Sequence, residues 1–207
     1  MDGNATVDAQ DPRSLRHLDL RVNRIPFYVQ GVQAALTALA LQKMHHPLDR
    51  IEIRVEGNDE PVHSTILVAY TQTVSSMAAI YSRLLLEFLG LKVGGRPSAL
   101  LPVEKRRRGD IGIENYQRED GTPFAKVAAS IVEDFPDAQR VREAWIITCD
   151  FAGQRLAHPT DDLKVEDIDV TPMLLRTFET LPELVTRVFL DEAVAPWGQV
   201  DAGTSRS

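Results

Sequence analysis

Cysteine is almost absent from this sequence, in which Cys149 is the only one among 207 residues. A single cysteine excludes an intramolecular disulfide and any zinc site built from several thiolates. It also fits a reducing compartment, so we expect a cytoplasmic protein. Because Cys149 lies at helical spacing from Trp145, on an apolar stripe, we expect a buried thiol and not a nucleophile.

Long hydrophobic runs and export signals are also missing. The first residues, MDGNATVDAQDPRS, have neither the basic nor the apolar region of a secretory signal. Polar or charged residues interrupt the most apolar stretches, 32–41 and 66–89, well before they reach the length that crosses a bilayer. We therefore expect a soluble protein with no membrane span.

The common enzyme motifs do not occur. The sequence contains no GxxxxGK, no strand-linked GxGxxG, no HExxH and no GxSxG. His45 and His46 are adjacent, and neighbouring side chains on a helix point about 100° apart, so they are poorly placed to share one ion. The sequence therefore predicts neither a metal site nor a cofactor.

An excess of positive charge is lacking as well, since the formal net charge is -7. Such a surface repels polyanions on average, which argues against broad nucleic-acid binding. The basic run 105–108 (KRRR) is a local exception that could hold phosphate through charge-assisted contacts. Charge patterning favours the alternative, in which these four side chains are solvated in a loop.

What the sequence does contain is helical periodicity. With 43% hydrophobic and 26% charged residues, the chain has the composition of a globular protein. We expect one domain at 14–195, with flexible polar tails at 1–13 and 196–207. Within it, apolar residues hold one stripe from about Ser64 to Leu89, which predicts a long central helix that Gly90 ends.

Shorter elements are expected on either side of this helix. Alternation in IEIRVE (51–56) predicts a short half-buried strand with no evident partner, and residues 91–121 read as an irregular connection, with a turn at Gly94-Gly95. The other expected helices run from near Pro26 to Pro47, from Thr122-Pro123 through Val132, from Asp137 to His158-Pro159, and from Thr171 onward. We expect Pro182 to kink the last helix or to split it, with Thr180 and Glu183 as a second capping box. The fold prediction is mainly α, a bundle of four to five helices; the alternative is α+β with a small hairpin at 47–62.

Polar residues inside apolar helical stretches supply the candidate site. Arg83 and Glu87 stand four residues apart on the central helix, and Gln154, Arg155 and His158 cluster in GQRLAHPT at the end of a later one. If the two helices pack together, these side chains form a pocket for an anion or a phosphate ester. Glu87, Arg155 and His158 are then catalytic candidates, with His158 as general acid or base, and Arg83 and Gln154 are binding candidates.

A structural role is the alternative for the same residues. Glu87 would form a buried pair with Arg155 or Arg83 that fixes the helix register, and His158 would cap its own helix.

Three segments together resemble a known group of proteins. SRLLLEFLG (82–90), GDIGIENYQ (109–117) and GQRLAHPT (153–160) are similar to blocks in small uncharacterised bacterial helical proteins that look like HEPN-type bundles. Many HEPN proteins are toxin or defence ribonucleases, so the resemblance implies a helical fold and RNA as a substrate. The HEPN signature places arginine four to six residues before histidine, however, and only two residues separate Arg155 from His158.

Two functions remain open at this point. The leading hypothesis is a helical protein that acts by protein or ligand interaction, as a homodimer that buries a helix face. The alternative is an enzyme that cleaves a phosphodiester, with RNA as its partner, through His158, Arg155 and Glu87. A metal-dependent hydrolase is the weakest reading.

Overall fold

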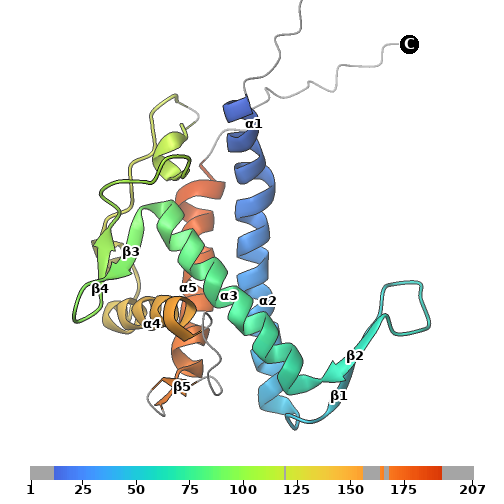
Figure 1. Cartoon of the computed structure of the whole chain (residues 1–207). Helices are drawn as coiled ribbons and strands as arrows, with labels where there is room; N and C mark the ends of the chain where they lie inside the picture. The colour runs from blue at the N-terminus through green and yellow to red at the C-terminus, as the bar shows by residue number, and fades with distance from the viewer. Residues whose placement is uncertain (1–11, 119, 156–163, 166–167, 193–207) are drawn as a thin grey trace, which may run out of the picture.

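Five α-helices dominate the computed structural model, which describes residues 12–118, 120–155, 164–165 and 168–192. The prediction of a mainly α fold is confirmed (Figure 1). The helices are α1 (Pro12–Asp19), α2 (Ile25–Met44), α3 (Leu67–Leu89), α4 (Ala138–Asp150) and α5 (Thr171–Val185). Three antiparallel pairs join β1 (Arg50–Ile53) to β2 (His63–Ile66), β3 (Leu91–Gly94) to β4 (Ala99–Pro102), and β5 (Lys164–Val165) to β6 (Ile168–Asp169).

The helix that leads into α2 begins well before Pro26, so the predicted start is wrong. Residues Leu20–Arg24 form a π-helical turn that joins α1 to α2 without a break. In that turn the N–H of Ile25 donates to the carbonyl of Leu20, five residues back. The wider spacing lets Pro26, which has no N–H to donate, lie within a continuing helix.

The central helix α3 is three residues shorter at its start than predicted. Ser64 belongs to β2, and the backbone of Ile66 is still extended (φ -89°, ψ 150°). The N–H of Leu67 donates to Asp49 O at 2.8 Å, which ties the first turn of α3 to the hairpin. At the other end the predicted stop is confirmed, because Gly90 adopts the left-handed conformation (φ 98°).

Of the strand predicted at 51–56, residues 51–53 are extended, in β1, while 54–56 leave the strand toward a turn. Its partner β2 comes mostly from residues predicted to begin the central helix. This hairpin leaves the pair α2–α3 at one end and points away from the other helices (Figure 1). The hairpin therefore matches the element named in the α+β alternative, although the fold around it is mainly α.

The helix predicted from Thr122-Pro123 through Val132 is wrong. Pro123 forms an isolated antiparallel bridge with Gln117, and the N–H of Phe124 donates to Tyr116 O at 3.0 Å. The chain is thus extended where the helix was predicted to begin, and the N–H of Val127, which a helix would direct to the carbonyl of Pro123, donates to Leu89 O at 2.9 Å instead. Only Ala129–Asp134 turns helically, as a 3₁₀ segment.

The connection 91–121 is more regular than predicted, because it contains the hairpin β3–β4. Gly94 ends β3, opposite Ala99, and Gly95 begins the turn with a positive φ of 93°. The turn interpretation of the glycine pair is therefore confirmed for Gly95 alone.

Helices α4 and α5 pack against each other and against α3 in the core. The indole N–H of the fully buried Trp145 donates to Thr180 Oγ1 at 3.0 Å, and the hydroxyls of Thr148 and Thr177 are 2.8 Å apart. Helix α5 runs on through Pro182, so the predicted split and second capping box are wrong. The Thr180 hydroxyl instead donates to the carbonyl of Arg176 within the same helix.

None of the described helices is long and apolar enough to cross a membrane. Of the two predicted tails, residues 1–11 and 196–207 lie outside the described residues, and α1 begins at Pro12.

Candidate functional site

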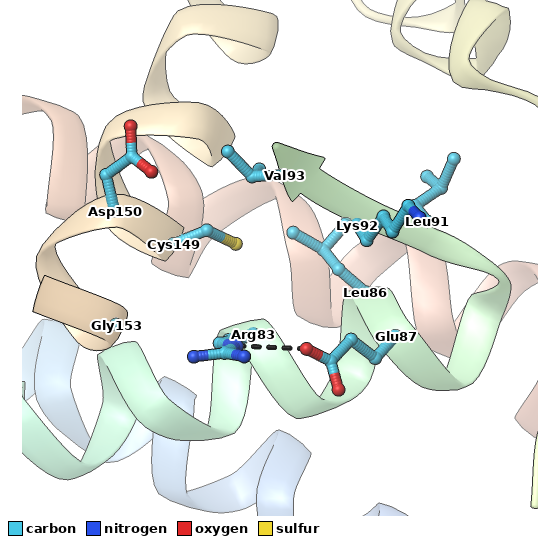
Figure 2. Close-up of a pocket in the computed structure, with 9 residues that line it drawn as sticks. All are labelled: Arg83, Leu86, Glu87, Leu91, Lys92, Val93, Cys149, Asp150 and Gly153. Atoms are coloured by element: carbon cyan, nitrogen blue, oxygen red, sulfur yellow. Dashed lines mark hydrogen bonds and ion pairs between the residues drawn. The ribbon is translucent and has the colours of Figure 1, made fainter. Parts of the chain in front are cut away.

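A pocket of about 220 Å³ lies where α3, β3 and the end of α4 meet, and two predicted site residues line it (Figure 2). Its four charged side chains are Arg83 and Glu87 from α3, Lys92 from β3 and Asp150 from α4. Two positive and two negative groups balance one another, so the described wall of the pocket does not favour an anion over a cation.

The pair Arg83–Glu87 is the best-defined feature of this pocket. Arg83 Nε donates to Glu87 Oε1 at 2.9 Å (Figure 2). The two side chains remain 49% and 40% exposed. An exposed pair of this kind contributes at most about 1 kcal/mol to stability. The expected buried pair that fixes helix register is therefore not formed by Arg83 and Glu87.

The end of α4 approaches this pair through a π-helical turn, Phe151–Arg155. A Cβ placed on Gly153 would lie 3.2 Å from Arg83 Nη1, so glycine lets the turn sit close to the guanidinium. Gln154 and Arg155 follow directly in the same turn, where only the course of the backbone is described. The structure thus brings the backbone that carries these two candidates next to Arg83.

The third catalytic candidate, His158, lies outside the described residues, as do 156–163 as a whole. The described residues that line the pocket therefore come from α3, from β3, and from the end of α4 and the turn after it as far as Gly153. Among the described residues no group of three or more histidine, cysteine, aspartate or glutamate side chains could hold a metal ion.

Cys149 also lines the pocket but is 6% exposed, which confirms the expected buried thiol. Burial raises the pKa of this thiol to about 12; Arg83 opposes the shift, and the carboxylates of Glu87 and Asp150 add to it. The thiol is protonated at neutral pH, and a protonated thiol is a poor nucleophile.

The basic run 105–108 has a structural member that the sequence did not reveal. Arg106 is only 14% exposed, and its Nε and Nη2 donate to the Glu114 carboxylate at 2.7 and 2.9 Å. Its Nη1 and Nη2 donate to the last-turn carbonyls of α3, those of Glu87 and Phe88, at 2.9 and 3.1 Å. The prediction of a fully solvated run is wrong for Arg106, because the C-terminal carbonyls of a helix attract a cation.

Lys105, Arg107 and Arg108 remain exposed, in line with the prediction for the rest of the run. Arg106 fits against Gly112, where a Cβ would lie 1.8 Å from Arg106 Nη2. In the sequence, the only signs of this contact were the glycine at this position and Glu114 two residues later. Neither could be linked to Arg106, because the sequence does not show that segment 91–121 folds back on itself.

A second candidate surface is apolar. We call residues 44–66 the hairpin arm: the end of α2, the β1–β2 hairpin and the turns around it. Of the twelve large apolar side chains that are exposed in the described residues, six lie on the arm. They are Met44, Leu48, Ile53, Val55, Val62 and Ile66.

The strand that we expected to be half buried is therefore exposed over much of its apolar side. Ile51 is partly buried, but Ile53, on the same side of the strand, is 40% exposed. Alternation in the sequence revealed the strand but not that the described residues leave much of its apolar side exposed.

Comparisons of this chain with family models, with curated proteins and with solved structures found no match. Its function is therefore argued from the chemistry of the pocket and of the arm.

Proposed function

We propose that this protein acts by protein–protein interaction, as a homodimer joined through the hairpin arm. The observation that carries the proposal is the concentration of exposed apolar side chains on an element that projects from the helices (Figure 1). Burial of apolar area contributes about 25 cal/mol per Å². A two-stranded hairpin alone is marginally stable and presents unpaired edges, so the arm gains from a partner that covers it.

A second copy is the occupant that best suits the arm. Arg50 and Glu52 on β1 and Arg54 after it already pair with one another, Arg54 with Glu52 at 2.7 Å, so these charges need no partner from another molecule. The exposed apolar side chains are therefore what a partner would cover, and most oligomers of soluble proteins are symmetric homodimers. The proposal places the dimer in the cytoplasm.

Sedimentation velocity across a range of micromolar concentrations tests this proposal. We expect the wild type to sediment as a dimer and Ile53→Thr/Val55→Thr to dissociate at least about ten-fold more readily, since threonine keeps the β-branched shape but loses apolar area. Met77→Gln is the matched control, because Met77 on α3 is also 40% exposed. A wild type that stays monomeric at about 100 µM would refute the homodimer.

A second proposal concerns the pocket, as a site for phosphodiester cleavage on RNA. It is supported by the placement of Arg83 and Glu87 beside the turn that carries Gln154 and Arg155. In this proposal Arg83 and Arg155 bind phosphate, and His158 and Glu87 transfer protons.

Incubation of labelled RNA with purified protein tests the second proposal. We expect cleavage by the wild type and by Arg107→Ala, whose side chain is exposed outside the pocket, and a loss of at least about 100-fold in His158→Ala and Glu87→Gln. Absence of cleavage, or equal rates in all four proteins, would reject it without bearing on the homodimer.

A further inference from the structure

We propose that the C-terminal segment, residues 193–207, folds back onto its own chain so that Trp197 covers an exposed surface of α2 and α3. We call this surface, formed by Phe27 of α2 with Tyr81 and Leu84 of α3, the aromatic face. The inference does not depend on the proposed homodimer, because the hairpin arm lies at the opposite end of the pair α2–α3 (Figure 1).

The exposure of the aromatic face is the first argument. Phe27 is 56% exposed and Leu84 is 39% exposed. Single apolar side chains on a surface are ordinary, but the ring of Phe27 lies 5.6 Å from that of Tyr81, so these apolar groups adjoin one another. An apolar surface that is contiguous in this way gains free energy when another group covers it.

The aromatic face has a fixed shape, which is the second argument. The ring of Tyr81 stacks on that of Tyr28 at 4.9 Å, and both side chains pack against the core. A Cβ placed on Gly31 would lie 2.8 Å from two ring carbons of Tyr81, so the ring rests directly on the backbone of α2. A surface that is already ordered loses little conformational entropy when another group docks on it.

The third argument is that the C-terminal part of the chain already covers one end of this apolar stripe. Tyr81, Leu84 and Phe88 lie on one side of α3, because they are three and four residues apart. The ring of Phe189, in the last described turn, packs against that of Phe88 at 4.8 Å. Leu84 and Tyr81 continue the stripe beyond this contact.

The length of chain that follows is the fourth argument. Glu192 is the last described residue, and Arg118 Nε donates to its Oε2 at 2.7 Å. The five residues from Glu192 to Trp197 can span about 17 Å when extended. Tyr81 stands seven residues before Phe88, a distance of about 10 Å along a helix. The segment is therefore long enough to bring Trp197 to the aromatic face.

The chemistry of Trp197 is the fifth argument. Among the residues that lie outside the described part of the chain, Trp197 is the only phenylalanine, tyrosine or tryptophan. Aromatic rings attract one another in edge-to-face and offset-stacked arrangements, in addition to the gain from burying their area. A cavity of about 400 Å³ adjoins Phe27, so an indole has room beside that ring.

Tryptophan fluorescence of the whole chain tests this contact, because the sequence contains only two tryptophans. Trp145 is fully buried, so the difference in emission between the wild type and Trp197→Phe isolates the emission of Trp197. We expect iodide to quench this emission at least about three-fold more weakly than that of a free peptide of residues 193–207, because docking removes the indole from water. The emission of Trp197 should also lie at a shorter wavelength than that of the peptide.

Two variants remove parts of the aromatic face, each measured against the same variant with Trp197→Phe. Phe27→Ala and Leu84→Gln should both raise the quenching of Trp197 toward that of the peptide, since each removes apolar contact area. Leu101→Gln on β4 is the matched control, because Leu101 is 36% exposed and lies outside the aromatic face. Its quenching should equal that of the wild type, and circular dichroism checks that every variant folds.

Three results would overturn the inference. The first is a Trp197 that iodide quenches in the wild type as strongly as in the peptide. The second is shielding that persists in both Phe27→Ala and Leu84→Gln, because the indole would then be buried elsewhere. Both of these results would leave the proposed homodimer standing. The third is shielding that weakens on dilution, since the segment that covers the face would then come from a second copy.

Discussion

Arg106 shows how one side chain can link three parts of this molecule. It binds the last carbonyls of α3 and the Glu114 carboxylate at once, and Lys126 Nζ lies 3.6 Å from the same carboxylate. Burial alone would raise the pKa of Glu114, but the hydrogen bonds and positive charge of Arg106, with the charge of Lys126, hold it below its usual range. A carboxylate with a lowered folded-state pKa stabilises the fold above its unfolded pKa of about 4.3.

Glu114→Gln should therefore cost about 1–2 kcal/mol of unfolding free energy at pH 7, since a charge-assisted bidentate contact is lost. The contribution of Glu114 is present above its unfolded pKa and is lost as pH falls through the lowered folded pKa. The difference between wild type and variant should thus shrink toward pH 3. Urea denaturation followed by circular dichroism at pH 7, 5 and 3 measures it.

The control for this variant is Glu133→Gln, which removes the partner of Arg142 at the surface. Glu133 is 65% exposed, so this change should alter stability by less than about 0.5 kcal/mol at any pH. Equal effects of both variants, or a Glu114→Gln difference that grows on acidification, would contradict the role given to Glu114.

Gly90 permits a second prediction at the residue scale. Its φ of 98° strains any L-residue, and a Cβ there would lie 2.7 Å from Lys126 Cβ. Gly90→Ala should lower the free energy of unfolding by more than about 2 kcal/mol. Gly109 also has a positive φ, of 94°, but nothing lies within 4 Å of its Cβ, so Gly109→Ala should lower that free energy by about 1 kcal/mol, through backbone strain alone. Thermal unfolding compares the two, and equal shifts would show that the contact with Lys126 is easily relieved.

At the scale of elements, α4 and α5 are held in register by buried hydroxyls. Thr148 and Thr177 are fully buried, and their hydroxyls bond to each other at 2.8 Å. Thr148→Val or Thr177→Val should lower the free energy of unfolding by about 1–2 kcal/mol, because the remaining buried hydroxyl loses its hydrogen-bond partner.

The double variant should cost clearly less than the sum of the singles, since no buried hydroxyl is then left unpaired. A double-mutant cycle by chemical denaturation measures the coupling. Strictly additive costs would mean that the bond between the two threonines contributes nothing.

The elements themselves were predictable where local patterns decide them. The stripe through α3, its stop at Gly90 and the start of α5 at Thr171 all depend on residues a few positions apart. The helix expected after Pro123 does not form because the chain pairs there with the segment before it, and the N–H of Val127 is bound by Leu89 O at the end of α3. Local capping preference cannot anticipate a partner that the fold supplies.

The same limit applied to the candidate site. Arg83 and Glu87 could be placed on one helix face from their spacing, and they do line one pocket with the end of α4. The contribution of Lys92 and Asp150 was not predictable, because it depends on where β3 and α4 come together in space. Likewise the exposure of the arm depends on which of the described segments pack against it, and spacing along the sequence does not show this.

At the scale of the whole molecule, the buried side chains gather into one cluster built from α2 to α5 and the segments between β3 and α4. The arm stands outside this cluster and carries the largest group of exposed apolar side chains. A homodimer joined through the arm accounts for both observations, since a second copy would cover side chains that the described residues leave exposed. The central claim is therefore that the arms of two copies pack against each other.

A cross-link between the arms tests the claim most directly. In a symmetric dimer joined through the arm, a cysteine on one arm lies near the same cysteine on the other, so a short bifunctional thiol reagent can join them. Cys149 is buried, so it should contribute little background. With this reagent Ile53→Cys should convert almost completely to a covalent dimer, while Met77→Cys and the wild type stay uncrosslinked on denaturing gels. If Ile53→Cys stays uncrosslinked, or crosslinks no faster than Met77→Cys, the two arms do not pack against each other.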